Sequence, residues 1–200
     1  MRRTLLAAGL LAVGLLAGCG GDEPDAAFAG AVLDQQYDVP DTPLTDTEGA
    51  SYSLASDTDK RLTLVFFGYT NCPDICQAVM ASLASAMTKI DEAEREQVDV
   101  VFVTTDPARD DAATLRTYLD RFDPTFIGLT GDLDTIVEIG EPLAVAVDQG
   151  EKLPSGGYEV THGTQVTAIN HADKVPVVWT QGTSAGEFAA DIRTLLTEES

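Results

Sequence analysis

The sequence predicts an α/β fold in which strands and helices alternate around one sheet and a β-hairpin precedes the last helix. Residues 62–69 form a dense run of β-branched and aromatic side chains, which is typical of a buried strand. Apolar residues recur at helical spacing after Pro73, and a second apolar run follows at 98–105. With 44% hydrophobic residues in a chain of 200, the composition fits one ordinary globular domain.

The predicted elements follow the chain in order. Residues 43–54 carry Gly49 between short apolar stretches, which indicates an N-terminal hairpin. Apolar spacing then predicts a helix from Pro73 to Ile90, with Cys72 at its N-cap. The later elements are expected in this order: a strand at 98–105, a helix at 110–122, a strand at 126–129, a helix at 132–140, a strand at 143–147, a loop at 149–157, a hairpin of strands 165–170 and 175–180, and a helix at 184–196.

This order gives a thioredoxin-like plan with an N-terminal hairpin and a late β-hairpin insertion. Ser184, followed three residues later by Glu187, has the pattern of a capping box at the start of the last helix. The turn between the first long strand and the first long helix lies at the carboxyl edge of such a sheet, where sites usually form. That turn carries Cys72 and Cys76.

The N-terminus predicts secretion. Arg2 and Arg3 precede an uncharged apolar run at 5–17, which is the layout of a signal peptide and is too short to span a bilayer. The run ends in Leu-Ala-Gly-Cys, which resembles a bacterial lipobox, so residues 1–18 are expected to be removed and Cys19 to be lipidated. An ordinary cleaved signal peptide is the alternative.

The segment after the signal peptide is predicted to be a tether. Residues 19–38 are rich in Gly, Asp, Ala and Pro and show no steady period, which is typical of a flexible linker. We therefore expect one folded domain at 39–200, held by the lipid anchor on the extracytoplasmic face of the cell membrane.

The charge of the chain argues against nucleic-acid binding. It has 12 Lys and Arg against 33 Asp and Glu, a formal net charge of −21. A nucleic-acid backbone is bound by clustered basic residues, and this charge repels it. Because the acidic residues are scattered, they indicate a solvated surface more than a surface for steering a basic partner.

Cys72 and Cys76 are the two cysteines left once Cys19 is assigned to lipidation, and three residues separate them. At positions i and i+4 of a helix, two Cβ atoms lie about 5–6 Å apart, farther than the roughly 3.5–4.5 Å of a disulfide, so the two thiolates can converge on a metal ion. A disulfide also stays possible, because an N-cap residue has non-helical dihedrals. The start of a helix favours the thiolate form, which raises both metal affinity and redox reactivity.

A third ligand can come from one of two histidines. His162 stands just before the late hairpin, where a loop at the carboxyl edge can bring it over the cysteine turn, and periodicity does not decide between a ligand and a structural role. His171 is expected to be an exposed residue of the hairpin turn. Met80 and Met87 fall on the apolar face of the predicted helix and are expected in the core.

Two thiolates and one imidazole form a small, soft set of three ligands. Such a set suits Cu(I) and also accepts Cu(II), whereas structural zinc normally takes four closed ligands. Copper is therefore the metal that this set of residues predicts.

Four segments together resemble the SCO/SenC family of copper proteins over nearly all of the predicted domain. Residues 67–76 read Phe-Gly-Tyr-Thr-Asn-Cys-Pro-Asp-Ile-Cys, similar to the family's cysteine segment. Residues 103–110 resemble its Asp-Pro-x-Arg-Asp segment, 126–131 its following strand and turn, and 158–162 the segment that supplies its histidine ligand.

The resemblance implies a thioredoxin fold that binds copper through Cys72, Cys76 and His162. It further implies delivery of copper to the dinuclear copper centre of cytochrome c oxidase, with the subunit that holds this centre as the partner. The alternative activity is that of a thiol-disulfide oxidoreductase, in which Cys72 and Cys76 are redox-active and reduce the cysteines of that centre. A peroxiredoxin-like peroxidase is a distant third reading, because the Pro-Thr-x-x-Cys setting of such enzymes is absent here.

The chain also departs from the family pattern. Gln77 stands where members often have Pro, Thr161 where an acidic residue is common, and Gly163 where Ser or Thr is usual. These changes leave the three expected ligands in place. They put in doubt the hydrogen bonds that would orient His162, and loss of such bonds alters metal affinity roughly 10 to 100-fold. The remaining polar and aromatic residues of interest are interpreted as structural: Asp106, Arg109, Asp110 and Trp179.

Overall fold

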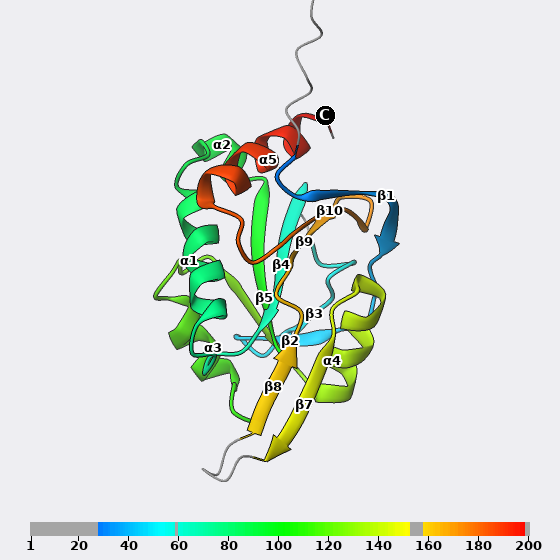
Figure 1. The fold of residues 1–200 in the computed structure, drawn as a ribbon, viewed down its shortest axis with the longest axis vertical. Helices are drawn as coiled ribbons and strands as arrows, with labels where there is room; N and C mark the ends of the chain where they lie inside the picture. Colours follow the sequence, from blue (N-terminus) through cyan, green and yellow to red (C-terminus); the bar gives the residue numbers. More distant parts are fainter. Residues whose placement is uncertain (1–27, 59, 153–157, 199–200) are drawn as a thin grey trace, which may run out of the picture.

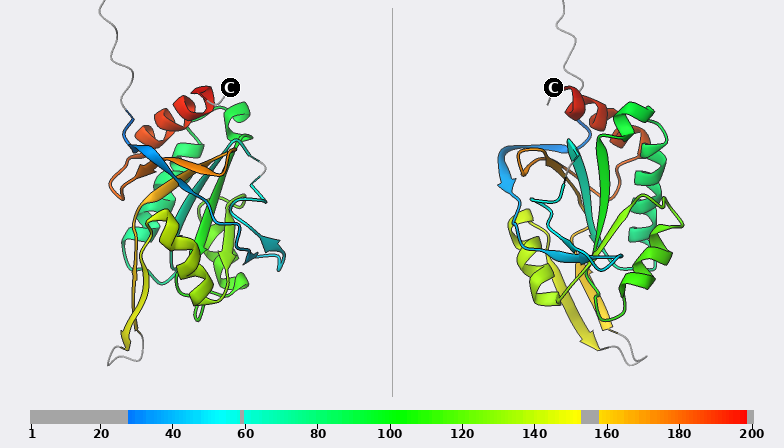
Figure 2. Two further views of the ribbon diagram at one scale, coloured as in Figure 1. Left: turned by 90° about the vertical axis from the view of Figure 1, so that its right-hand side faces the viewer. Right: turned by 180° about the vertical axis from the view of Figure 1, so that it is seen from behind.

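The computed structural model describes residues 28–58, 60–152 and 158–198. Within these residues an eight-stranded sheet has the order β1-β10-β9-β4-β5-β6-β2-β3, and β7 and β8 form a separate two-stranded sheet. Helices lie on both faces of the larger sheet, and the β7–β8 hairpin projects from one end of the molecule (Figure 1; Figure 2). Cys19 and the predicted signal peptide lie outside the described residues.

The strands and helices have the following bounds. The strands are β1 (Ala31–Asp38), β2 (Leu44–Asp46), β3 (Ser51–Tyr52), β4 (Leu62–Gly68), β5 (Val98–Thr104), β6 (Ile127–Thr130), β7 (Val147–Lys152), β8 (Tyr158–His162), β9 (Val166–Asn170) and β10 (Lys174–Trp179). The helices are α1 (Ile75–Met87), α2 (Glu92–Arg95), α3 (Ala112–Leu119), α4 (Leu133–Gly140) and α5 (Ala185–Glu198), with a 3₁₀ turn, η1, at Glu141–Leu143.

The centre of the sheet is parallel and its edges are antiparallel. β4 pairs with β5, and β5 with β6, in parallel, while β9 pairs antiparallel with the other side of β4. The β4–α1–β5–α3–β6 succession and the late β9–β10 hairpin match the predicted thioredoxin-like plan. Because β4 and β5 run in the same direction, the loops that follow them meet at one edge of the sheet.

β4 is buried along its whole length because helices cover both faces of the sheet. Leu64 and Phe66 belong to a core formed with α1, α3 and α5, whereas Val65 and Phe67 belong to a second core under α4. This alternation follows from the period of two in a strand. The residues predicted as core are buried in the first cluster: Met80, Met87 and Trp179.

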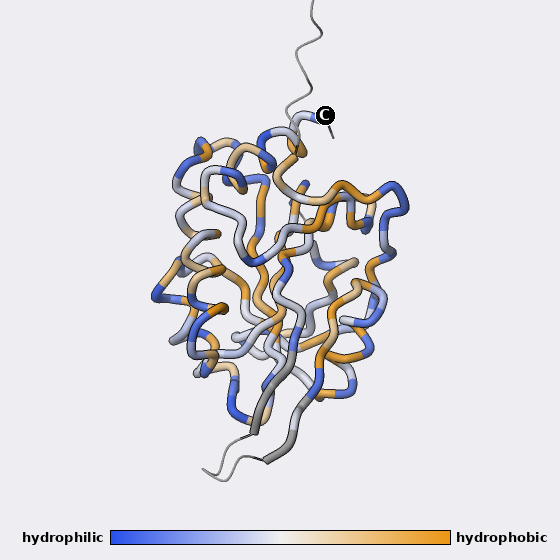
Figure 3. Tube along the Cα trace, viewed as in Figure 1, coloured by the Kyte–Doolittle hydropathy of each residue, from blue (hydrophilic) through white to orange (hydrophobic). Residues whose placement is uncertain are grey.

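Hydropathy follows the same layering. Hydrophobic residues are concentrated along the central strands, and hydrophilic residues lie mostly at the outer turns (Figure 3). Among the helices that the structure describes, none combines the length and the apolar character that crossing a bilayer requires.

Both predicted hairpins are present. β2 and β3 pair antiparallel across a turn in which Gly49 has a φ of +86°, a left-handed conformation that glycine adopts without strain. β9 and β10 pair antiparallel, and Asn170 accepts hydrogen bonds from the turn between them. The capping box of the last helix is confirmed: the N–H of Ser184 donates to the Glu187 carboxylate, and the N–H of Glu187 donates to the Ser184 hydroxyl.

The expected tether was wrong for its last eight residues. β1 pairs antiparallel with β10 and adds an edge strand to the sheet. Its composition gives little sign of this, because most of its side chains are exposed and the pairing partner lies far away in the chain. The buried Asp191 carboxylate fixes the start of this segment by accepting hydrogen bonds from the backbone N–H groups of Ala29 and Gly30, at 3.2 and 2.9 Å.

Two further expectations were wrong. The predicted strand at 143–147 is interrupted, because Pro142 lies in η1 and Ala144 takes a left-handed φ of 56°. The extended structure begins at Val147 instead, so part of the predicted loop at 149–157 is strand β7. In addition, the N-cap of α1 is Asp74 and not Cys72, because Pro73 and Asp74 separate Cys72 from the first helical residue.

Candidate metal centre

The loop between β4 and α1 places two thiols at the start of a helix. Cys76 lies in the first turn of α1, and Cys72 lies just ahead of the N-cap. The N-cap side chain, Asp74, makes no capping hydrogen bond. The backbone N–H of Cys76 donates to Cys72 Sγ at 3.5 Å, so a thiol occupies the place that a capping oxygen usually takes.

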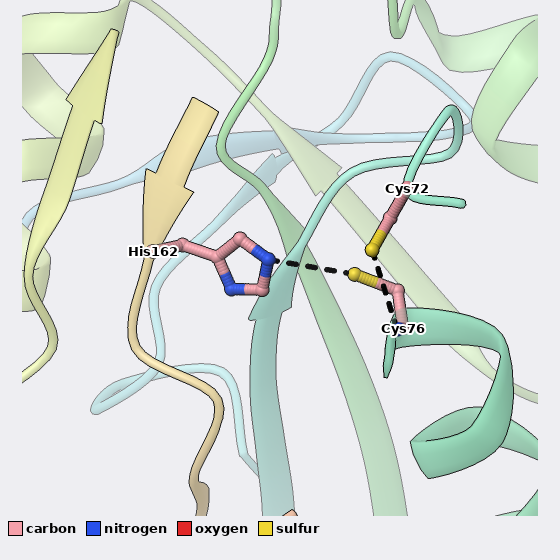
Figure 4. Close-up of side chains that lie close together, drawn as sticks. All are labelled: Cys72, Cys76 and His162. Carbon is pink, nitrogen blue, oxygen red and sulfur yellow. Dashed lines mark hydrogen bonds between the residues drawn. The ribbon is translucent and has the colours of Figure 1, made fainter. Parts of the chain in front are cut away.

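The third member of the group comes from the separate hairpin. His162 is the last residue of β8, and its Nε2 lies 3.5 Å from Cys76 Sγ. The two sulfur atoms and one imidazole nitrogen all lie within 4.8 Å of one another and converge in Figure 4. The structure thus brings together the three predicted site residues, while His171 lies exposed in the β9–β10 turn.

A backbone carbonyl orients the imidazole. His162 Nδ1 lies 2.8 Å from the carbonyl oxygen of Gly163. Because a carbonyl only accepts, Nδ1 carries the proton and Nε2 turns its lone pair toward the cysteines. The rings of Phe66 and Tyr69 meet the imidazole edge-on, with centroids 6.0 and 5.6 Å away. The departure at Gly163 therefore leaves the His162 ring with an orienting partner, supplied by the main chain.

The environments of the two thiols differ. Burial opposes ionisation of Cys72, but backbone N–H groups at the start of α1 outweigh it and lower the pKa of this thiol. Burial raises the pKa of Cys76, and the neighbouring Cys72 raises it further. Burial also lowers the pKa of His162, which keeps the imidazole neutral and able to bind a metal at pH 7.

We expect Cys72 to react with iodoacetamide at least about tenfold faster than Cys76 in the folded, reduced protein at pH 7, because the thiolate is the reacting form. Mass spectrometry of the single-cysteine variants Cys72→Ser and Cys76→Ser, in a soluble form lacking residues 1–19, measures each rate. In urea the two rates should converge, which serves as the control. Equal rates in the folded protein would contradict the difference in environment.

The donor set and its geometry fit a small, soft metal ion. An ion about 2.0–2.3 Å from each ligand atom needs these atoms roughly 3.5–4 Å apart, close to the observed grouping. Two thiolates and one imidazole in a three-coordinate arrangement favour Cu(I) over zinc. A cavity of about 320 Å³ opens onto Cys72 and His162 but not onto Cys76; its lining residues are Tyr69, Cys72, Pro73, Asp74, Ile75, His162 and Thr164.

The structural interpretation of the Asp-Pro-x-Arg-Asp segment was incomplete. Arg109 forms an ion pair with the buried Asp106, as expected of a loop residue. Asp110, however, contacts the cysteine loop by accepting hydrogen bonds from Thr70. Tyr69 was also missed, although it lies only three residues before Cys72. The signal for Asp110 was weak in the sequence, because 40 residues separate it from Thr70.

Fold and site together define a thioredoxin-like protein with a Cys-Cys-His group at the carboxyl edge of its sheet. A profile of the SCO1/SenC family matches residues 34–197, which include all three members of that group. The chain belongs to the SCO1/SenC family. The family that the sequence segments suggested is thereby confirmed.

Individual relatives agree with this assignment. A putative copper-binding protein of Stutzerimonas stutzeri is 30% identical over 138 residues, which cover 69% of this chain and 67% of that protein. Apo Sco1 of Thermus thermophilus superposes with a TM-score of 0.77 at 27% identity, covering 84% of this chain and 97% of that one. Copper-bound ScoI of Bradyrhizobium japonicum gives a TM-score of 0.68 at 27% identity, covering 80% and 98%. The chain spans only 39% and 51% of two longer mitochondrial SCO2 relatives.

Proposed function

We propose that this protein binds copper through Cys72, Cys76 and His162 and supplies it to the dinuclear copper centre of cytochrome c oxidase. The observation that carries the proposal is the convergence of two sulfur atoms and one imidazole nitrogen within 4.8 Å. The copper named for the relatives from Stutzerimonas and Bradyrhizobium supports the metal, and the resemblance of the sequence to the family supports the partner.

The unequal accessibility of the three ligands suits transfer better than storage. Cys72 and His162 line the open cavity, so an incoming ligand of a partner reaches the metal from their side. Cys76 is fully buried behind them and would be the last ligand to release the ion. The neutral imidazole loses no proton when copper binds at pH 7, and the lowered pKa of Cys72 eases the loss of its proton, whereas the raised pKa of Cys76 means that copper has to displace the proton of this thiol.

The same pair of thiols supports a second function, reduction of a disulfide in the partner. The Cys72 thiolate would attack one sulfur of that disulfide and form a mixed disulfide, with the other partner sulfur leaving as a thiolate. Cys76, after losing its proton, would then attack Cys72 and release the second partner thiol, which leaves a Cys72–Cys76 disulfide. The contrast between the lowered pKa of Cys72 and the raised pKa of Cys76 favours this division of roles.

We place the protein on the extracytoplasmic face of the membrane, anchored through a lipid on Cys19. The support is the lipobox-like end of the apolar run at 5–17. Metabolic labelling with a fatty-acid analogue tests this placement. Label that disappears in Cys19→Ala supports it, and equal labelling of the two proteins would refute it.

A copper titration tests the principal function. The reduced soluble form lacking residues 1–19 is titrated with Cu(I) against a competing chelator, beside the variant Cys72→Ser/Cys76→Ser. We expect one tightly bound copper ion in the wild-type protein and none in the variant. Failure of the wild-type protein to compete for Cu(I), together with rapid reduction of a disulfide substrate, would favour the reductase instead.

A further inference from the structure

Asp110 is a buried carboxylate that lies between the two loops at the carboxyl edge of the sheet. Its side chain is fully buried, and it precedes α3 in the loop after β5. It accepts hydrogen bonds from the backbone N–H of Thr70 at 2.8 Å, the hydroxyl of Thr70 at 2.5 Å and the hydroxyl of Thr104 at 2.8 Å. Two of these three donors belong to the loop that carries the cysteines.

A buried charge is costly unless strong hydrogen bonds replace its hydration. The donors at Asp110 are neutral, so the carboxylate depends on their number and geometry. Hydrogen bonds to a carboxylate are shorter and roughly twice as strong as those between neutral groups. Moving Thr70 away would therefore remove two of the three hydrogen bonds to the buried Asp110 carboxylate. The free-energy cost of losing them holds the backbone of Thr70 in place.

Thr70 lies only two residues before Cys72, and other contacts fasten the same stretch. The N–H of Thr105 donates to the carbonyl of Gly68 at 2.7 Å, which joins the loop after β5 to the end of β4. The N–H of Cys72 donates to the carbonyl of Tyr69 at 3.2 Å, which closes a tight turn around Thr70. The position of Thr70 thus determines where this turn presents the Cys72 sulfur.

We infer that Asp110 is a positioning residue for the metal centre: through Thr70 it holds the cysteine loop so that Cys72 Sγ stays within reach of His162 Nε2. This inference rests on the proposed binding of copper by that group. Asp110 touches none of the three ligand atoms by a hydrogen bond in the structure, so its effect on the metal passes through the loop. Loosening such support typically lowers metal affinity about 10 to 100-fold.

The pair Thr70→Val and Thr104→Val separates loop positioning from general stability. Each substitution removes one hydroxyl donor from the same buried carboxylate while keeping nearly the same shape, but only Thr70 is part of the cysteine loop. Thr104→Val also removes the acceptor of the Asp106 N–H, so it is the more disruptive of the two for the loop after β5. Thr70→Ser restores the hydroxyl and serves as the rescue. Urea unfolding of each variant shows that it is folded under the conditions of titration.

We expect Thr70→Val to lower the Cu(I) affinity about 10 to 100-fold in chelator competition, and Thr70→Ser and Thr104→Val to stay within about threefold of the wild-type protein. The rate of Cys72 alkylation by iodoacetamide, measured without copper, should change at least about fivefold in Thr70→Val only. A wild-type affinity in Thr70→Val, or an equal loss in Thr104→Val, would overturn the inference. If the wild-type protein binds no copper, the proposed function fails, and the alkylation rates still decide whether Asp110 positions the loop.

Discussion

Replacing His162 by Ala should lower the affinity for Cu(I) by at least about 100-fold, more than the 10 to 100-fold typical of a lost outer partner. In the proposed site His162 supplies one of three ligand atoms, so its removal would leave only the two sulfur atoms. Its loss also removes part of the wall of the open cavity beside Cys72. Competition with a Cu(I) chelator, run on the reduced soluble form, measures the change.

The chain provides a matched control in its other histidine. His171 lies exposed in the β9–β10 turn, away from the sulfur atoms. His171→Ala should therefore leave the Cu(I) affinity within about twofold of the wild-type value. If both variants bound copper as tightly as the wild-type protein, His162 would not be a ligand and the three-residue site would be wrong.

Replacing Asp191 by Ala should lower the free energy of unfolding by about 2–5 kcal/mol, the largest loss that we expect from a single polar residue. Asp191 accepts hydrogen bonds from Trp179 Nε1 at 2.7 Å and from the N–H groups of Gly30 and Ala29. Alanine would leave buried donors without partners, and each unsatisfied donor costs about 1–3 kcal/mol. Urea unfolding followed by circular dichroism and by fluorescence measures the loss.

Trp179 is the only tryptophan of the chain, so its emission reports directly on this cluster. Asp34→Ala is the control, because Asp34 is an exposed residue on β1 and should change the stability by less than about 0.5 kcal/mol. Asp191→Asn keeps the shape and one acceptor and should fall between the two. A stability of Asp191→Ala equal to that of Asp34→Ala would show that the hydrogen bonds at Asp191 contribute little.

The central part of the fold could be predicted because its signals are local. β4 is a continuous apolar run, and α1 follows Pro73 with apolar residues at helical spacing, so pattern alone gives their type and order. β1 could not be predicted, because it is a largely exposed edge strand that exists through pairing with β10. The strand expected at 143–147 was wrong for the opposite reason. The apolar pattern was present, but the left-handed backbone conformation of Ala144 interrupts the extended structure.

In the candidate site, too, the residues with a local sequence signal could be predicted and those that depend on long-range contacts could not. Cys72 and Cys76 could be recognised from their spacing within one turn, whereas the role of His162 depends on a contact across 86 residues. Periodicity left that role open, and the resemblance to the family supplied it. The hydrogen bonds between Asp110 and Thr70 could not be predicted, because an Asp just before a helix is also typical of a helix cap. Only the three-dimensional arrangement shows that Asp110 is buried against the cysteine loop.

Because the β7–β8 hairpin is separate from the main sheet, metal binding would restrict its movement. His162 belongs to a separate two-stranded sheet, while Cys76 lies in α1 and Cys72 in the loop that joins α1 to β4 of the main sheet. A copper ion held by all three would act as a crosslink that closes an 86-residue stretch of chain, much as a disulfide restricts an unfolded chain. Copper binding would therefore reduce the mobility of the hairpin, and copper release would restore it. The backbone amides of β8 would exchange hydrogen more slowly in the copper-bound protein than in the copper-free protein.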